Sequence, residues 1–165
     1  MWELRIVAEH PQSHTFVKPR RRDTALLVPF SEEFMPYLQL DVPYEYTSDQ
    51  KKAAAKRIGA IYSDVMKVNT NIITVTIREV GKGGVWRCSD GDPDEAAIMM
   101  LDIRRGRPIE QRAELARQLI EACVELLDLK TNRLNVEFTQ HSGDEMYHPI
   151  LGGFNKDWIE DERSE

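Results

Sequence analysis

The chain has 165 residues, of which 41% are apolar and 30% are charged, a composition that fits one globular domain with a hydrophobic core. The formal charge of −6 lies entirely in residues 36–165, because residues 1–35 carry as many basic as acidic side chains, and this argues against nucleic acid as a partner. The sequence lacks the apolar stretch of a secretory signal or a membrane span, and Cys88 and Cys123 have neither disulfide-framework nor zinc-site spacing. We therefore expect a cytoplasmic protein that uses no membrane, metal or organic cofactor.

Residues 1–35 form a leader without sustained periodicity, and its basic cluster Lys18–Arg22 is more typical of a solvated or untranslated segment than of a nucleic-acid arm. Met35 and Pro36 directly precede the alternating run 37–42 and have the pattern of a start site. If translation began at Met35, removal of the methionine would expose Pro36 as a secondary amine, which acts as a base or nucleophile once its pKa is lowered toward neutrality. In the full chain the same nitrogen is an amide without a basic lone pair. We expect the leader to be a mis-assigned start or a flexible extension.

The first predicted unit, residues 36–80, has the pattern of a strand, a helix and a strand. Its three segments are residues 36–42, 47–67 and 71–80. The first alternates apolar and polar residues, the second places apolar side chains at helical spacing after an N-cap at Thr47 or Ser48, and the third is rich in β-branched residues.

After a turn-rich linker at residues 81–96, the second unit, residues 97–153, repeats this order, and residues 154–165 form a tail. Its segments are a strand at 97–103, a helix at 108–127 and a strand at 134–139. A triplet of an acid, a glutamine and a base recurs about 61 residues apart in the two predicted helices. Two fused β-α-β units with right-handed crossovers predict an α/β fold, a four-stranded sheet with both helices on one face. The bare face predicts burial against other subunits.

The stretch 102–112, Asp-Ile-Arg-Arg-Gly-Arg-Pro-Ile-Glu-Gln-Arg, resembles the Gly-Arg-Ser-x-Glu-Gln-Lys stretch of 4-oxalocrotonate tautomerase. Residues 36 to about 153 thereby resemble the tautomerase superfamily, whose members are single or fused β-α-β units with an N-terminal catalytic proline. In that family a substrate-binding arginine lies ten positions after the proline. Ten positions before Arg107 is Ala97, so the resemblance implies that the second unit has lost its proline and that Pro36 is catalytic. Arg104 and Arg107 match the Arg-x-x-Arg pair that binds the substrate carboxylate in the fused enzymes cis-3-chloroacrylic acid dehalogenase and malonate semialdehyde decarboxylase.

Other positions depart from the dehalogenase. Tyr62 falls where that enzyme has a histidine, Glu137 where it has a tyrosine, and His148 where it has the glutamate that activates water. These three are possible site residues with new roles, and the departures argue against dehalogenase or hydratase chemistry. Trp86 either walls the pocket or seals a subunit interface. His141 and His148 have the alternative of being solvated loop histidines.

The sequence therefore predicts a tautomerase-like isomerase that acts on a small carboxylated enol or keto acid. Pro36 would be the general base after processing, and Arg104 and Arg107 would bind the substrate carboxylate. The resemblance also implies that the subunits assemble as a homotrimer. The alternative enzyme is a decarboxylase, or a hydratase or dehalogenase, acting on a three-carbon acid. If the leader is retained, the alternative is a catalytically silent trimeric binding module, with Pro36 as an ordinary first residue of a strand and the arginines as surface charge.

Overall fold

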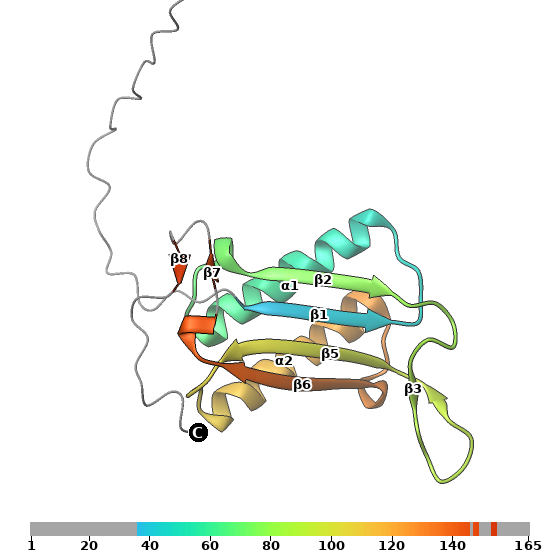
Figure 1. Cartoon of the computed structure of the whole chain (residues 1–165). Coiled ribbons are helices and arrows are strands. Elements are labelled where there is room, and N and C mark those ends of the chain that lie inside the picture. The colour runs from blue at the N-terminus through green and yellow to red at the C-terminus, as the bar shows by residue number, and fades with distance from the viewer. Residues whose placement is uncertain (1–35, 146, 149–152, 155–165) are drawn as a thin grey trace, which may run out of the picture.

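The computed structural model describes residues 36–145, 147, 148, 153 and 154, which form a four-stranded sheet covered on one face by two helices (Figure 1). The sheet strands are β1 (Tyr37–Val42), β2 (Thr74–Glu79), β5 (Ala97–Arg104) and β6 (Leu134–His141), and the helices are α1 (Ser48–Met66) and α2 (Ile109–Leu127). In the order β2-β1-β5-β6, β1 is parallel to β2, β5 is parallel to β6, and the central strands β1 and β5 are antiparallel. This confirms the predicted α/β fold. The predicted leader and residues 155–165 of the predicted tail lie outside the described residues.

The two helices begin differently but end alike. Thr47 and Gln50 form a capping box at the start of α1, in which the Gln50 amide donates to Thr47 Oγ1 at 3.2 Å and the Thr47 amide donates to Gln50 Oε1 at 2.9 Å. α2 begins after Pro108, whose fixed φ suits a helix start. The C-cap residues that follow the two helices are Lys67 and Asp128, which have φ values of 56° and 52° in the left-handed region. Such caps are usually glycine, so both units share an uncommon feature.

The two units repeat at a constant offset. Both helices have 19 residues, and α2 begins and ends 61 residues after α1, as Ser48 to Ile109 and Met66 to Leu127 show. Because β1 and β5 are antiparallel neighbours, an approximate two-fold axis between them relates the two units. Each unit's first strand consequently begins where the other unit's first strand ends.

The sheet therefore has two related ends. Tyr37 lies opposite Asp102 in the β1-β5 pairing, so Pro36 lies beside the last residues of β5. Asp41 lies opposite Ile98 at the other end, so Ala97 lies beside the last residues of β1. We call these the Pro36 end and the Ala97 end.

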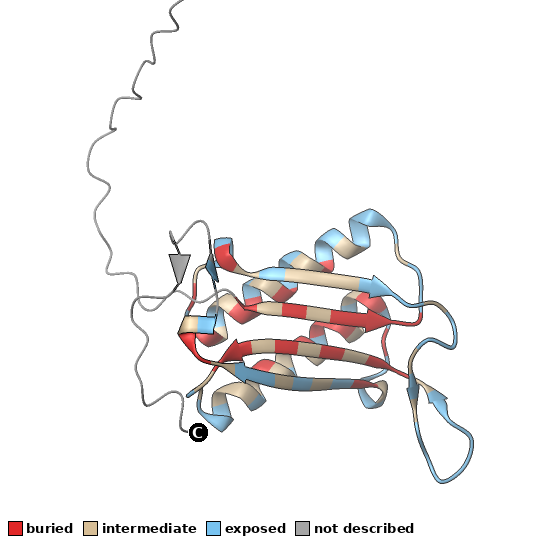
Figure 2. Cartoon of the chain, in the orientation of Figure 1, coloured by how far each residue is buried: buried red, intermediate tan, exposed pale blue. Residues whose placement is uncertain are grey.

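The hydrophobic core fills the space between the sheet and the helices. Its largest fully buried side chains are Leu38, Leu40, Ile58, Met66, Met99, Leu101, Ile103, Leu115, Leu119 and Leu127. In Figure 2 buried and half-buried residues alternate along β5, as expected for a strand with one face on the core. Both helices contribute inward-facing residues at the predicted helical spacing.

The uncovered face of the sheet carries a polar network. Tyr37 Oη donates to Gln39 Oε1 at 3.2 Å, Gln39 Nε2 donates to Asp41 Oδ1 at 3.2 Å, and Arg78 Nε donates to the same Asp41 oxygen at 2.7 Å. The hydrogen bond to Asp41 raises the pKa of Arg78 above its ordinary value. Burial of this face against other subunits stays a prediction, and it would have to leave these polar groups with their partners.

Shorter elements complete the described chain. They are the 3₁₀ helices at Thr70–Ile72, Thr131–Arg133 and Gly143–Glu145 and the strands β3 (Trp86–Arg87), β4 (Asp94–Glu95), β7 (Tyr147–His148) and β8 (Gly153–Phe154). β3 and β4 pair as a small antiparallel ribbon within the predicted turn-rich linker. None of the helices in the described part of the chain combines the length and apolarity that a bilayer crossing requires.

Candidate active site

Pro36 is the first described residue and directly precedes β1. Its side chain is buried, and its carbonyl oxygen accepts a hydrogen bond from the Thr74 amide at 3.1 Å, which extends the β1-β2 pairing to the proline. The antiparallel register places Pro36 beside the end of β5, where Arg104 is the last residue. Residues far apart in the sequence thus meet at one end of the sheet.

The two predicted carboxylate ligands flank a tight turn. Arg104 ends β5 and is only 4% exposed, whereas Arg107 is half-buried and follows the turn. Gly106 has a φ of +86°, a conformation that residues with a Cβ rarely adopt, so glycine allows the chain to reverse between the arginines. α2 begins at Ile109, directly after this turn. The turn therefore keeps both guanidinium groups close to the end of β5.

Tyr62, on α1, belongs to the same end of the molecule. The residue is 3% exposed, and burial raises the pKa of its phenol well above the ordinary value. The charge of Arg107 opposes that rise in pKa, and the charge of Asp102 adds to it. The last turns of α1 lie beside the start of α2, because Gln111 Nε2 donates to the Val65 carbonyl oxygen at 2.8 Å. The neutral phenol of Tyr62 remains a hydrogen-bond donor.

A polar cluster lies beside Arg104 on the uncovered face. The parallel pairing of β5 with β6 sets Asp102 opposite Thr139 and Arg104 opposite His141. Thr139 Oγ1 donates to Asp102 Oδ1 at 3.0 Å, and His141 Nε2 lies 3.5 Å from the same oxygen, which makes an ion pair when the imidazole is protonated. His141 Nδ1 lies 3.1 Å from the Ser142 carbonyl oxygen. The cluster supplies an oriented imidazole next to the predicted carboxylate ligands.

Sequence reasoning named His141 but missed its partners Asp102 and Thr139. Alternation along β5 does place Asp102 and Arg104 on one face, and the same rule pairs Thr139 with His141 on β6. The missing information is the register between the two strands, which a single sequence does not display. Asp102 was available as a signal because it is an acid inside an otherwise apolar strand.

Two other predicted residues lie away from Pro36 within one chain. Glu137 is exposed in the middle of β6, opposite Met100. Trp86 is 52% exposed on β3, at the Ala97 end. His148 is in β7, and its side chain lies outside the described structure. Among the described residues, the predicted site residues that gather at one end are therefore Pro36, Arg104, Arg107, Tyr62 and His141.

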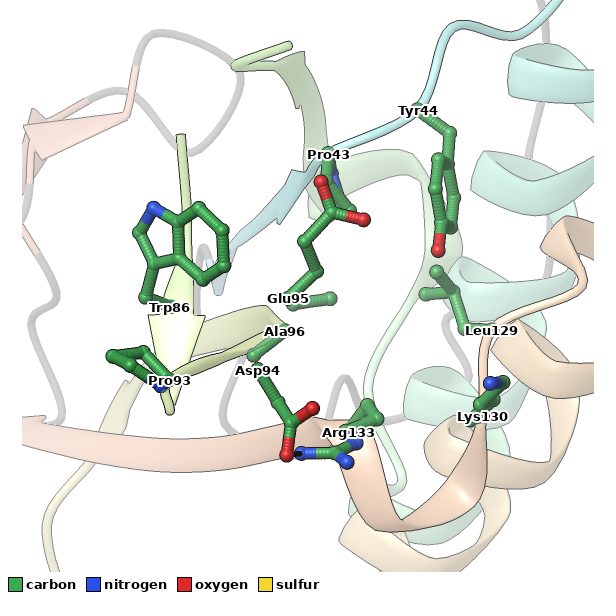
Figure 3. Close-up of a pocket in the computed structure, with 11 residues that line it drawn as sticks. Pro43, Tyr44, Trp86, Pro93, Asp94, Glu95, Ala96, Leu129, Lys130 and Arg133 are labelled. Atoms are coloured by element: carbon green, nitrogen blue, oxygen red, sulfur yellow. Dashed lines mark ion pairs between the residues drawn. The ribbon is translucent and has the colours of Figure 1, made fainter. Parts of the chain in front are cut away.

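The Ala97 end carries a cavity of about 330 Å³ (Figure 3). Its lining residues include Ala97, Pro43 and Tyr44 from the ends of the two central strands, together with Trp86 and Arg133. The cavity occupies the position that the two-fold relation assigns to a second copy of the Pro36 end. It contains neither a proline at the start of β5 nor an arginine at the end of β1.

The sequence matches no known family model and no curated protein. Solved structures are similar in fold. N1, a member of the cis-3-chloroacrylic acid dehalogenase family, has a TM-score of 0.64 at 16% identity, over 77% of this chain and 88% of that one. Pt0534 inactivated by 2-oxo-3-pentynoate has a TM-score of 0.62 at 18% identity, over 72% of this chain and 94% of that one. A symmetric trimer of the fused 4-OT named Q0 gives the same TM-score, identity and coverage as Pt0534. These likenesses confirm that the chain has the tautomerase-superfamily fold that the sequence predicted.

Proposed function

We propose that the chain catalyses keto-enol tautomerisation of a small carboxylated acid in a processed form that begins at Pro36. The observation that carries this proposal is the position of Pro36 beside the end of β5, where Arg104 is buried and Arg107 follows the turn. A free prolyl amine in this place would be partly desolvated and close to two fixed positive charges. Both effects disfavour the protonated amine and lower its pKa toward neutrality, which suits a general base.

The arginines have a separate task in the proposed reaction. A guanidinium group pairs with a carboxylate through two parallel hydrogen bonds, so Arg104 and Arg107 would fix the acid group of the substrate. Pro36 would then take the proton from the enol hydroxyl and return it to the carbon at the other end of the same conjugated system. The positive charges would stabilise the enolate formed between these two transfers. Tyr62 and His141 are the candidate hydrogen-bond donors to the enolate oxygen.

We further propose that the active form is a cytoplasmic homotrimer. The support is the uncovered face of the sheet, which includes Met100 and Ile98 among polar residues, and the description of the similar fused 4-OT Q0 as a symmetric trimer. A closed assembly would cover this face.

A second candidate function is a decarboxylase, hydratase or dehalogenase acting on a three-carbon acid. The observation that favours it is the Asp102-His141 pair, because an imidazole oriented by a carboxylate can remove a proton from water. Glu137 is exposed in the middle of β6 and would take part only if another subunit brought a site to it. His148 stays a proposed participant. If the leader is retained, Pro36 is an amide, and the chain would serve as a catalytically silent binding module.

The first test is the N-terminus of the protein purified from its native cells, measured as an intact mass. A mass that begins at Pro36 is the expected result, and a mass that begins at Met1 contradicts the amine mechanism. The second test uses 2-oxo-3-pentynoate, whose alkyne next to a ketone accepts an amine. We expect the chain that begins at Pro36 to gain the mass of one reagent molecule at Pro36 and to lose activity.

The matched control for the labelling is the full chain, in which the Pro36 nitrogen is an amide. It should not be labelled at Pro36. Activity is measured on 2-hydroxymuconate and phenylenolpyruvate, with a three-carbon acid assayed in parallel to distinguish the second candidate function. If the processed protein converts only the three-carbon acid, the result contradicts the tautomerase proposal and favours the second candidate function.

A further inference from the structure

The cavity at the Ala97 end has side chains that suit a ligand of a different charge from the one proposed at the Pro36 end. The 61-residue offset relates Arg104 and Arg105 to Pro43 and Tyr44, and it relates Arg107 to Tyr46. Two of these positions have therefore changed from a guanidinium to an aromatic ring. The backbone arrangement is shared, and the chemistry of the lining is not.

Aromatic rings stand on two sides of this cavity. Figure 3 shows Trp86 on one side and Tyr44 on the other, with Glu95 between them. Trp86 and Tyr44 both line the cavity, and they are 52% and 47% exposed. The Trp86 ring is held in place because its Nε1 donates to the Gly83 carbonyl oxygen at 2.8 Å. A fixed indole face that is open to a cavity is a binding surface for a cation.

The charges around the cavity leave one carboxylate available. Arg133 Nη1 lies 2.6 Å from Asp94 Oδ2, so these two charges compensate each other, as the dashed line in Figure 3 marks. Glu95 is half-buried and accepts a hydrogen bond from the Gly83 amide at 3.3 Å. Among the described residues, none forms an ion pair with Glu95. A half-buried carboxylate between two aromatic rings is stabilised by a positive ligand.

We propose that this cavity binds a small organic cation, an alkylated ammonium group, between Trp86 and Tyr44 with Glu95 as its counter-charge. An alkylammonium group combines apolar surface for the rings with a diffuse charge for the carboxylate. The volume lies at the lower end of the range for ligand pockets, about 300 to 1,000 Å³, and so fits a compact ligand. Lys130 is exposed at the rim, and Arg133 is already occupied by Asp94, so an anion would meet Glu95 without a buried cation to offset it.

The test uses the full chain and a pair of probes that differ in charge but hardly in shape. Choline and its neutral counterpart 3,3-dimethyl-1-butanol are titrated by calorimetry and by the fluorescence of tryptophan. We expect choline to bind with a dissociation constant of about 1 mM or lower and the neutral alcohol to bind at least tenfold more weakly. Equal affinity for the two probes would overturn the proposal, because the cavity would then be only a hydrophobic pocket. Absence of choline binding would also overturn it.

Variants connect the binding to the named residues. Glu95→Gln and Trp86→Leu should each weaken choline binding about tenfold or more, while the neutral alcohol should respond to Trp86→Leu alone. The matched control is Glu121→Gln, which removes the same charge from the exposed surface of α2 and should leave choline binding within twofold. An equal loss in Glu121→Gln and Glu95→Gln would show a general charge effect and contradict a site at Glu95. The result does not depend on whether Pro36 is free, so this proposal and the proposed tautomerase can fail separately.

Discussion

The two ends of the sheet have the same backbone arrangement and opposite side-chain chemistry. At the Pro36 end, an imino acid precedes β1, and two arginines follow at the end of β5. At the Ala97 end, an alanine begins β5, and Pro43 and Tyr44 follow β1. One fold thus supplies a cationic site and an aromatic cavity from positions related by 61 residues.

The difference extends to the helices. Tyr62 on α1 is related by the same offset to Cys123 on α2, and both side chains are buried. Tyr62 lies within the electrostatic influence of Arg107 and Asp102, whereas burial alone raises the pKa of Cys123, to about 12. The comparison teaches that a repeated fold preserves its packing positions more strictly than the charges at its ends.

Among the tests of the difference between the two ends, replacement of Pro36 should have the largest effect. In a chain that begins at position 36, Pro36→Ala should lower kcat for tautomerisation by about 10² to 10⁴-fold, because general-base catalysis contributes on that order. The measurement is steady-state kinetics on 2-hydroxymuconate. Ala97→Gly is the matched change at the other end and should leave kcat within about twofold once the protein is folded. Similar losses in both variants would remove the distinction between the ends.

The two ends share one core, so a core substitution should affect both. Leu101 is fully buried on β5 and lies opposite Leu38. Leu101→Ala should reduce the free energy of unfolding by about 2 to 5 kcal/mol, measured by urea denaturation. Its neighbour Met100 is on the uncovered face, and Met100→Ala should cost less than half as much. An equal cost would indicate that the uncovered face is packed as tightly as the core, as in a stable oligomer.

The arginines at the two ends should also differ in their effect on KM. Arg104→Gln removes a guanidinium at the Pro36 end and should raise KM for the carboxylated substrate about 10 to 100-fold, the loss expected for a charge-assisted hydrogen-bonded pair. Arg133→Gln removes a guanidinium at the Ala97 end and should leave KM unchanged. A larger increase in KM for Arg133→Gln than for Arg104→Gln would indicate that the substrate binds at the Ala97 end, which contradicts our proposal.

Alkaline pH should produce the smallest effect, a loss of folding stability that depends on Cys123 of α2. Burial raises the pKa of Cys123 from 9.0 to about 12, so the folded state keeps a proton that the unfolded state releases above pH 9. This contribution to stability is complete below pH 9 and is lost as the pH rises toward 12. Cys123→Ala should therefore show a shallower loss of stability between pH 9 and 10.5 in denaturation measurements. An unchanged slope would show that other groups, such as Tyr46 with a pKa raised to about 12, dominate this range.

The main elements could be predicted because their signals are local. Alternation identified β1, and helical spacing after an N-cap at Thr47 or Ser48 identified α1 within one or two residues of its observed bounds. The β3-β4 ribbon was not predicted, because its strands have two residues each and depend on turn geometry at Gly83. A pattern rule needs a longer segment to detect a strand.

The candidate site was predictable only in part. Arg104 and Arg107 were predicted from the resemblance of residues 102–112 to the tautomerase superfamily, and Pro36 was predicted from that resemblance and from its place before an alternating strand. The Asp102-His141 contact depends on the register between β5 and β6, which arises from the packing of the whole sheet. The cavity between Trp86 and Tyr44 likewise joins segments that no sequence pattern connects.

Because each unit's first strand begins where the other unit's first strand ends, neither unit contains a whole site. The proposed base comes from one half of the chain, and the proposed carboxylate ligands come from the other half. Separate subunits with these sequences could also pair like with like, and such pairs would hold two prolines without arginines or two arginine turns without a proline. Fusion into one chain fixes the halves in equal amounts and makes every molecule a mixed pair.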